Sequence, residues 1–470
     1  MLFERFEDKG LSHYSYAVGC KACGAIAIVD PRRDIDIYLE FASSQNVAIA
    51  YVLETHIHAD FASGASELAA RTGARLMLSA LDRGELYEVK FPHQDLNDGQ
   101  EILLGSARIA ARHTPGHTPE HLSFLVYDAN RAPETPQLML SGDFLFVGSL
   151  GRPDLLGEEA KRGLAERLYD SVQRLVDLPD GVEVHPAHGS GSMCGAGMSD
   201  RPMSTLGFER VANPYLRRGM TRAEFVAKIL GGVPPFPPYY RRMKALNSSG
   251  PRALNGLPGL EALELEPFKV RLDAGAVVID LRDQLAFGGG HIPGAFGIGA
   301  GQDVSTWASW AVPYDTPILL VDHDSSRIEQ AVRSLVRVGL DQVEGHLKGG
   351  MNAWIAAGLP ASRTAQLSPA ELHDRLQRGE PIRVIDVRSD AEWRSGHVDG
   401  ATHIMGGLLP DRTSELMEAR SPLAVVCGAG YRSTVAASVL ERAGVGPVYN
   451  VTGGMTAWTK AGLPTTTSAS

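Results

Sequence analysis

The strongest constraint on the fold is an internal repeat in the second half of the 470-residue chain. The stretch VVIDLRDQLAFGGGHIPGA, at 277–295, returns as RVIDVRSDAEWRSGHVDGA at 383–401. A second stretch, LKGGMNAWIAAGLP, returns as VTGGMTAWTKAGLP close to the end of the chain. A repeat of this length indicates two tandem copies of one domain, at roughly 260–362 and 366–470.

Each copy alternates short apolar strands with helical segments. PILLVDH is followed by RIEQAVRSLVRVG in the first copy, and PLAVVCG by STVAASVLERAG in the second. This alternation predicts a parallel sheet with helices on both faces. The stretch 231–260 is rich in Pro and Gly and has neither a helical nor a strand period. We therefore expect a linker at 246–259, after a first domain at 1–245.

Composition narrows the class of protein. The length is typical of about three domains, and a net charge of −10 argues against a nucleic-acid partner. No apolar run approaches the ~20 residues of a membrane span, and the start, MLFERFEDKG, does not have the pattern of a secretory signal. We expect a cytoplasmic protein without a membrane partner, and its four cysteines are too few for a disulfide framework.

The second copy has a candidate nucleophile in VVCGAGYRST, where Cys427 ends an apolar strand and Arg432 stands where a helix begins. Backbone N–H groups of such a glycine-rich turn form an anion-binding nest, and the helix dipole and Arg432 favour a thiolate. A lone intracellular cysteine is more often structural. Gly428, Gly430 and Arg432 around Cys427 favour the catalytic interpretation.

These motifs resemble the rhodanese, or sulfurtransferase, family, through VIDVR…GHVDGA, the Cys-to-Arg loop and GGMTAW…AGLP. The resemblance implies that Cys427 carries a persulfide between turnovers. Cys427 and Arg432 are the expected catalytic residues, and Gly428 and Gly430 are expected to bind the substrate. The loop from Cys427 to Arg432 is one residue shorter than in the related phosphatases and arsenate reductases. A shorter loop makes a narrower anion-binding site, which is expected to fit a sulfur atom.

The first copy departs from the rhodanese pattern. In LVDHDSSRIE, Asp322 stands at the position of Cys427, while Arg327 still matches Arg432. A carboxylate cannot accept a sulfane sulfur. We therefore expect an inactive domain with a structural or docking role.

The first domain has four segments with potential metal ligands, each after an apolar strand: THIHAD, RHTPGHTPEHLSF, MLSGDFLF and VEVHPAHG. Histidines and carboxylates at several strand ends converge on one edge of a sheet, as a metal site requires. One HxHxD motif is a moderate signal. Four such segments in this order indicate a metal centre rather than histidines scattered in polar loops.

This set resembles the metallo-β-lactamase fold superfamily, an αββα sandwich, and within it the persulfide dioxygenase branch, through ETHIHAD, TPGHTPEHLSF, SGDFLFVGSLGRPD and HPAHG. The branch holds one Fe(II) per chain with two histidines and one aspartate. These residues map to His56, His117 and Asp143, which form the facial triad of non-haem iron oxygenases. The dinuclear glyoxalase II type has a histidine for a second metal where this chain has Phe61, and a phenyl ring has no lone pair.

The other positions of the resemblance imply supporting roles. His58, Asp60 and His188 match the ligands of a second metal and are expected to orient the iron ligands and tune the iron. Arg152 matches an arginine that binds a carboxylate of glutathione, and its guanidinium suits a planar anion. Ser190 stands where the branch often has a tyrosine for glutathione. The carrier thiol is therefore left open among glutathione, coenzyme A, bacillithiol and other small thiols.

Three further cysteines have open roles. Cys194, six residues after His188, is a possible accessory thiol that accepts a persulfide or gates substrate entry, or else an ordinary loop residue. Cys20 and Cys23 form CKACG between two apolar segments. Such a pair can bind zinc or be redox active. With no second pair in the chain, we expect a hairpin turn.

The combined resemblances imply an α/β multidomain enzyme, with a sandwich followed by two rhodanese-like domains. The first domain would oxidise a thiol persulfide with O2 to sulfite and thiol, and Cys427 would interconvert sulfite or persulfide and thiosulfate, in sulfide oxidation and detoxification. The alternatives are a dinuclear zinc thioester hydrolase and a non-catalytic sulfur carrier or sensor. A homo-oligomer is expected, with a number of subunits that the sequence does not give.

Overall fold

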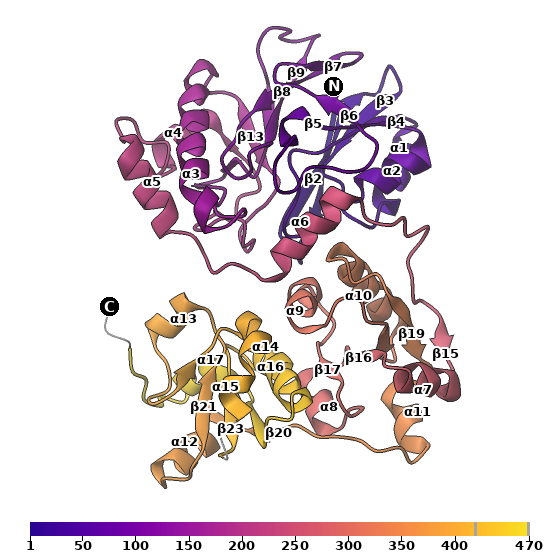
Figure 1. Ribbon diagram of the computed structural model, residues 1–470, viewed down its shortest axis with the longest axis vertical. Helices are drawn as coiled ribbons and strands as arrows, with labels where there is room; N and C mark the ends of the chain where they lie inside the picture. Colours follow the sequence, from indigo (N-terminus) through magenta and orange to yellow (C-terminus); the bar gives the residue numbers. More distant parts are fainter. Residues whose placement is uncertain (418–420, 468–470) are drawn as a thin grey trace. The chain divides into compact units, whose positions relative to one another are not determined.

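The computed structural model describes residues 1–417 and 421–467. The chain divides into two units: unit 1 consists of 1–256 with 336–339, and unit 2 of the other residues from 257 onward. Figure 1 shows the helices and strands of both units in sequence colours.

Two six-stranded sheets form the centre of unit 1, in the orders β1-β2-β3-β4-β5-β6 and β14-β13-β10-β9-β8-β7. Both are mixed, since β1 and β2 pair antiparallel while β3 and β4 pair parallel, and β10 pairs antiparallel with β9 and parallel with β13. The strands of unit 1 are β1 (Leu2–Asp8), β2 (His13–Cys20), β3 (Ala25–Val29), β4 (Ala48–Leu53), β5 (Arg75–Ser79), β6 (Gln94–Leu96), β7 (Glu101–Leu104), β8 (Ala107–His113), β9 (Leu122–Asp128), β10 (Leu138–Gly142), β11 (Leu145–Phe146), β12 (Ser149–Leu150), β13 (Glu183–Pro186) and β14 (Ser204–Thr205).

Strand β2 is buried along its whole length because both of its faces are covered. Tyr16 and Val18 point into the core between the two sheets, together with Phe124 and Leu140 from the second sheet. Ala17, on the opposite face, packs in a separate core with residues of the outer helices. Side chains alternate between the faces of a strand, so this strand contributes to two cores at once.

Helices cover the outer face of each sheet, as Figure 1 shows with α1 and α2 on one side of the sheets and α3, α4 and α5 on the other. The helices of unit 1 are α1 (Asp36–Gln45), α2 (Ala65–Thr72), α3 (Glu158–Gln173), α4 (Leu206–Ala212), α5 (Arg222–Gly231) and α6 (Tyr239–Ser249). The expected αββα sandwich is confirmed.

Helix α6 corrects one expectation, because the sequence around it predicts no helical period between 231 and 260. Its buried residues include Tyr240, Met243, Lys244 and Asn247, which recur at the three- and four-residue spacing of one helix face. Two of the four are polar, so this face does not look apolar in the sequence. The segment is an integral part of unit 1 rather than an irregular arm.

Unit 2 contains two five-stranded sheets with the same order of strands, β15-β19-β18-β16-β17 and β20-β24-β23-β21-β22. All their strand pairs are parallel, as expected. The strands are β15 (Ala262–Leu263), β16 (Val277–Asp280), β17 (Phe296–Gly297), β18 (Ile318–Val321), β19 (Val343–Leu347), β20 (Ala365–Leu367), β21 (Arg383–Asp386), β22 (Thr402–His403), β23 (Leu423–Val426) and β24 (Val448–Val451).

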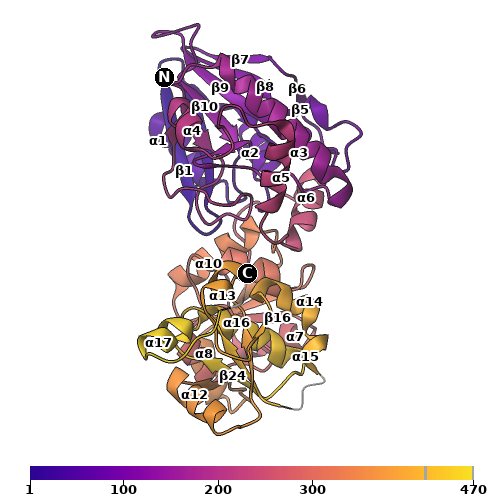
Figure 2. The ribbon, with the colours of Figure 1, turned by 90° about the vertical axis from the view of Figure 1, so that its left-hand side faces the viewer.

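Helices pack on both faces of each sheet of unit 2. Ala424 and Val426 of β23 pack with Trp458 on one face, and Leu423 and Val425 pack with Leu440 on the other. Figure 2 shows α12 and α17 on one side of this copy and α14 and α15 on the other. The helices are α7 (Leu265–Asp273), α8 (Gln284–Gly289), α9 (Val304–Ala311), α10 (Ser325–Arg337), α11 (Gly350–Ala356), α12 (Pro369–Gln377), α13 (Asp390–Ser395), α14 (Leu409–Arg412), α15 (Ser414–Met417), α16 (Tyr431–Arg442) and α17 (Gly454–Lys460).

The repeated motifs make the same contacts in both copies. Arg282 donates to the Asp280 carboxylate and, over 2.7 Å, to the carbonyl oxygen of Gly290. Arg388 donates to the Asp386 carboxylate and to the carbonyl oxygen of Gly396, also over 2.7 Å. Each pair connects the end of the strand to the segment that leads to the next strand; the pair in the second copy is buried, and the pair in the first copy is partly buried. Within the described residues, no helix combines the length and apolar character needed to cross a membrane.

Candidate functional site

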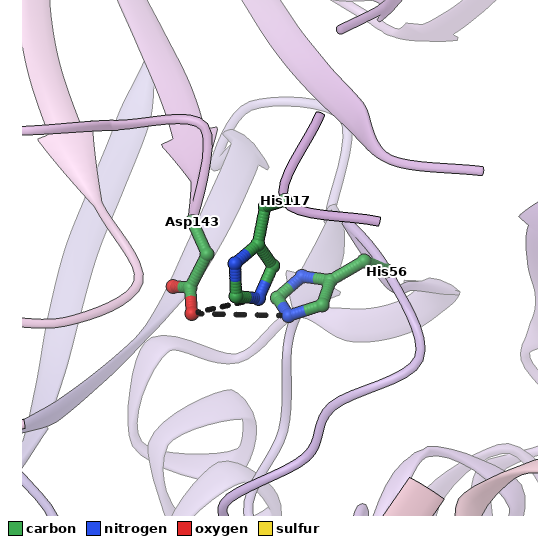
Figure 3. A group of neighbouring side chains, drawn as sticks. All are labelled: His56, His117 and Asp143. Atoms are coloured by element: carbon green, nitrogen blue, oxygen red, sulfur yellow. Dashed lines mark ion pairs between the residues drawn. The ribbon is translucent and has the colours of Figure 1, made fainter. Parts of the chain in front are cut away.

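Three potential metal ligands of unit 1 meet at one edge of the sandwich. His56 follows β4, His117 lies between β8 and β9, and Asp143 follows β10. Each strand end is fixed by sheet pairing, so side chains far apart in sequence come together there. Figure 3 shows the three side chains pointing toward a common space.

The ligand atoms of this group converge and have no hydrogen-bond partner in the described part of the chain. Asp143 Oδ2 lies 3.4 Å from His117 Nε2 and 3.9 Å from His56 Nε2. Within the described part of the chain, none of these three buried atoms has a hydrogen-bond partner. Unpaired buried polar atoms are unfavourable, so their convergence fits a bound cation.

The remaining polar atom of each residue is held by the protein. His56 Nδ1 lies 2.9 Å from Thr55 Oγ1, and His117 Nδ1 lies 2.9 Å from the Arg152 carbonyl oxygen. Asp143 Oδ1 lies 2.6 Å from Nδ1 of His188. Such contacts orient the rings and favour a lone pair on each Nε2. Burial, with help from neighbouring histidines, lowers the pKa of His56 and of His117, so both rings stay neutral, as metal ligation requires.

Asp60, His188 and Cys194 form a second buried group of potential ligands next to Asp143. His188 Nε2 lies 2.7 Å from Asp60 Oδ2. Burial opposes a charge on His188, but Asp143 and Asp60 outweigh it and raise the pKa of His188. Cys194 is buried, with its sulfur 3.6 Å from the Tyr240 hydroxyl, and burial together with Asp60 and Asp143 raises the pKa of its thiol.

His58 belongs to a third buried group rather than to the second. Its Nε2 lies 3.2 Å from Asp30 Oδ1 and 3.6 Å from Glu54 Oε2. The THIHAD motif therefore places His58 and Asp60 in different groups, although both match positions of a second metal.

Phe61 is completely buried, and its ring packs against two imidazoles. The ring centroids lie 4.4 Å from His58 and 4.1 Å from His13. The sequence does not single out His13, because it stands in strand β2 far from the four ligand segments. Phe61 thus fills the space between His58 and His13.

Helix α6 holds the loop that contains His56, a role that the sequence does not indicate. Lys244 Nζ donates to the Ile57 carbonyl oxygen over 2.9 Å. Asn247 Nδ2 donates to the carbonyl oxygens of His58 and Phe61 over 2.9 and 2.7 Å, and Asn247 Oδ1 accepts from the backbone N–H of Ser63 over 2.9 Å. Both side chains lie on the buried face of the helix. In the sequence, only the three- and four-residue spacing of Tyr240, Lys244 and Asn247 indicates this face.

Arg152, expected to bind substrate, is fully buried and its donors are used inside the protein. Its Nε and Nη2 donate to the two Asp154 carboxylate oxygens over 2.7 and 2.9 Å. Further hydrogen bonds reach the carbonyl oxygens of Met193 and Pro234 over 3.0 and 2.9 Å. This arrangement anchors the loop before Cys194 and offers a substrate no free donor on Arg152.

The second candidate site surrounds Cys427 in unit 2. The sulfur accepts the backbone N–H of Gly430 over 3.0 Å and lies 3.3 Å from Ser433 Oγ, both at the start of α16. Gly430 has a φ of 108°, a conformation that favours glycine. The carbonyl oxygens of Cys427 and Gly428 accept N–H groups from α17, over 2.7 and 2.9 Å. Gly428 and Gly430 are thus parts of a fixed loop around the sulfur.

Arg432 extends over this loop and is paired with Glu392 of α13, at 2.7 and 2.6 Å. The Ser389 N–H and hydroxyl also donate to Glu392, over 3.0 and 2.8 Å. The hydrogen bonds from Arg432, and then those from Ser389, lower the pKa of Glu392 to about 2. A carboxylate therefore neutralises part of the positive charge at the mouth of the loop.

The corresponding loop of the first copy contains its own anion. The backbone N–H groups of His323 and Asp324 donate to Asp322 Oδ1 over 2.6 and 3.1 Å. Arg327 Nη2 lies 3.3 Å from Asp322 Oδ2. The Asp322 carboxylate thus occupies the donors that a sulfur substrate would use.

Known families match both parts of the chain. The metallo-beta-lactamase superfamily matches residues 9–188, and the rhodanese-like domain matches 264–357 and 368–461. A metallo-beta-lactamase from Staphylococcus aureus has a solved structure that is 32% identical in sequence with a TM-score of 0.65, over 74% of this chain and 99% of that chain.

Two curated relatives match unit 1. The hydroxyacylglutathione hydrolase of Anaeromyxobacter dehalogenans is 30% identical over 242 residues, which are 46% of this chain and 86% of that protein. The mitochondrial persulfide dioxygenase of Bos taurus is 27% identical over 223 residues, which are 46% of this chain and 76% of that protein. The αββα fold, the family matches and these similarities agree, and the chain belongs to the metallo-beta-lactamase superfamily and carries two tandem rhodanese-like domains.

Proposed function

We propose that the chain is an iron-dependent persulfide dioxygenase joined to a sulfurtransferase. The observation that carries the proposal is the convergence of three unpaired ligand atoms from His56, His117 and Asp143. Two imidazoles and one carboxylate are the donor set of non-haem iron oxygenases. The similarity to a persulfide dioxygenase supports the choice of reaction.

Iron held by these residues would supply the redox capacity and open positions that O2 and a persulfide sulfur require. The chain keeps both imidazoles neutral by burial and fixes their tautomers through Thr55 Oγ1 and the Arg152 carbonyl oxygen. His188 holds the second oxygen of Asp143. The overall reaction is R–S–SH + O2 + H2O → R–SH + SO3²⁻ + 2 H⁺.

At the second site, Cys427 would take a sulfane sulfur from another persulfide and release its thiol. The N–H of Gly430 and the hydroxyl of Ser433 point to the sulfur, where they would stabilise negative charge on it. Sulfite would then attack the outer sulfur of the cysteine persulfide, breaking its S–S bond, to give thiosulfate and the Cys427 thiolate. The reverse direction would feed persulfide to the iron.

The dioxygenase is tested by oxygen consumption of the iron-loaded full chain with persulfides of glutathione, coenzyme A and bacillithiol. Uptake with at least one persulfide is expected, and none with the Asp143→Asn variant, which keeps the shape of the side chain but loses its charge. The proposal fails if the parent protein consumes no oxygen with any of them. The buried Arg152 leaves the carrier thiol open, so the ranking of the three substrates identifies it.

The coupling is tested by the products of the same reaction. Parent protein should give thiosulfate, whereas Cys427→Ser should consume oxygen at the parent rate and release sulfite instead. If Cys427→Ser left the thiosulfate output unchanged, the two sites would not be coupled.

A dinuclear thioester hydrolase is the second candidate, favoured by the Asp60, His188 and Cys194 group beside the first. The similarity to a hydroxyacylglutathione hydrolase supports it as well. Metal analysis separates the two proposals. About one iron per chain with oxygen uptake supports the dioxygenase, and two zinc ions with thioester cleavage support the hydrolase.

A further inference from the structure

Two cysteines meet at the tip of the hairpin between β2 and β3, which confirms the turn expected there. Cys20 is the last residue of β2, and Cys23 lies in the turn, two residues before β3 begins. The Cys23 sulfur lies 3.3 Å from the Cys20 carbonyl oxygen. Cys23 is exposed, whereas the side chain of Cys20 turns inward and is 6% exposed. One thiol of the pair therefore faces solvent while the other is sheltered.

The turn between β7 and β8 brings Gly105 and Ser106 against the two sulfurs. A Cβ atom on Gly105 would lie 2.6 Å from the Cys23 sulfur and 2.9 Å from the Cys20 sulfur, so both sulfurs crowd the same point. Gly105 also has a φ of 60°, in the left-handed region that favours glycine. Gly105 thus leaves room for the two sulfurs, and the side chain of any other residue at this position would fill that room.

Ser106 activates one member of the pair. Hydrogen bonds from the Ser106 hydroxyl, and then from its backbone N–H, lower the pKa of Cys20 to about 6. Partial desolvation, and then the neighbouring Cys20 side chain, raise the pKa of Cys23. At neutral pH the pair consists of a sheltered Cys20 thiolate and an exposed Cys23 thiol, so a base for the Cys23 proton lies beside the thiol that solvent reaches.

A zinc site is disfavoured by the surroundings of the pair. Structural zinc takes four ligands. Among the described residues, the groups of three or more potential metal ligands contain neither Cys20 nor Cys23. Redox chemistry needs only the two sulfurs, and these are adjacent.

We propose that Cys20 and Cys23 form a redox-active dithiol that reduces low-molecular-weight persulfides, a site separate from both proposed catalytic centres. The substrate class rests on the proposed function, but the site needs neither the metal nor Cys427. In the first step the Cys20 thiolate takes the Cys23 proton, and the exposed Cys23 sulfur attacks the outer sulfur of R–S–SH. Cys23–S–SH forms as the R–S bond to the outer sulfur breaks, and R–S⁻ leaves and takes that proton as R–SH.

In the second step the Cys20 sulfur attacks the Cys23 sulfur, and the terminal sulfur leaves as hydrogen sulfide with the second proton. A disulfide joins Cys20 and Cys23. The cysteines lose two electrons, which reduce the sulfane sulfur to sulfide. The net reaction is R–S–SH + 2 Cys–SH → R–SH + hydrogen sulfide + Cys–S–S–Cys, and small thiols would reduce the disulfide again.

The test uses the full-length Cys427→Ser protein without oxygen, so that neither proposed catalytic centre turns over. Glutathione persulfide is added, free thiols are alkylated, and peptides are mapped by mass spectrometry while sulfide is measured. We expect an intramolecular disulfide between Cys20 and Cys23 and the release of about one sulfide per chain. Adding Cys20→Ser should stop the reaction after the first step and leave a persulfide on Cys23.

Two matched variants probe the geometry. Ser106→Ala removes a donor to the Cys20 sulfur and should slow disulfide formation, whereas Ala22→Ser, exposed in the same turn, should leave the rate unchanged. The proposal is overturned if both cysteines stay alkylatable after persulfide treatment. It is also overturned if the Cys20→Ser/Cys23→Ser double variant releases as much sulfide as its parent. These outcomes do not depend on oxygen uptake, so they are independent of the dioxygenase proposal.

Discussion

In each of His56, His117 and Asp143, one polar side-chain atom contacts the protein and the other is available to bind a metal ion. One atom is fixed by a hydrogen bond, and the other faces the shared space without a partner. Removal of the fixing partner would let the ring turn, which would reduce metal affinity even though all three ligands remained. The neighbouring Phe61 has the opposite character, since it fills space and offers no donor atom.

Phe61→His tests whether this phenyl ring prevents binding of a second metal. The change introduces a ligand nitrogen directly after Asp60 in the chain. This nitrogen would add a fourth donor to the group of Asp60, His188 and Cys194, and zinc sites have four donors. Metal content should therefore rise from about one toward two ions per chain. Metal analysis after loading measures this, with Phe61→Leu as the apolar control that should stay at one. A histidine variant with one metal and unaltered activity would contradict the role given to Phe61.

The ion pair of Glu392 and Arg432 should make the stability of unit 2 depend on pH. The folded-state pKa of Glu392 is about 2, below its usual 4.5. The contribution of this pair to the free energy of unfolding is therefore complete above about pH 4.5. It is lost as the pH falls toward 2, because Glu392 in the unfolded chain takes up a proton that Glu392 in the folded chain does not. Urea unfolding of unit 2 in the full chain should thus show a steeper loss of stability below pH 4.5 in parent protein than in Glu392→Gln. Parallel curves would show that the pair does not contribute to this pH dependence.

At the scale of elements, helix α6 decides how firmly the loop of the metal ligands is held. Asn247 alone fixes two carbonyl oxygens and one N–H of this loop, and Lys244 fixes a third carbonyl oxygen. These polar atoms are sheltered from water. Losing their partner therefore leaves them unsatisfied as well as freeing the loop.

Asn247→Ala should weaken metal binding about 10-fold or more, the usual effect of losing a residue that orients ligands. Two carbonyl oxygens and one N–H lose their partner, so unfolding free energy should also fall by about 1–3 kcal/mol. Metal affinity is measured by competition with a chelator, and stability by urea unfolding. Ser249→Ala, exposed on the same helix, is the control. Equal affinities for the two variants would mean that α6 does not position the ligands.

The elements also show where the sequence is informative. Strands and repeats are predictable because their apolar runs and the GGM…AW motif recur, and they give the sandwich and both parallel sheets. Helix α6 is not predicted, because its buried face uses Lys244 and Asn247, whose burial depends on carbonyl groups in a distant loop. The same reason hides His13 and the internal bonding of Arg152: long-range partners, not local patterns, determine their surroundings.

At the scale of the whole molecule, the proposed function would join two kinds of sulfur chemistry in one chain, whose rhodanese-like domain is duplicated and has Cys427 only in its second copy. The copies keep the same strand order and the same Asp–Arg–Gly contacts, but Asp322 in the first fills the loop that Cys427 leaves available in the second. The duplication thus preserves the fold in both copies and the proposed sulfur acceptor, Cys427, in one.

Mixing two variants that each lack one of the two proposed activities tests whether sulfite passes through solution. Asp143→Asn lacks the dioxygenase but keeps Cys427, and Cys427→Ser has the opposite defect. Because sulfite is a small soluble anion, equal amounts of the two proteins with a persulfide and oxygen should recover thiosulfate, with a yield that falls as both are diluted. Thiosulfate is measured against each variant alone. If the mixture releases only sulfite even at high protein concentration, transfer requires both sites on the same chain.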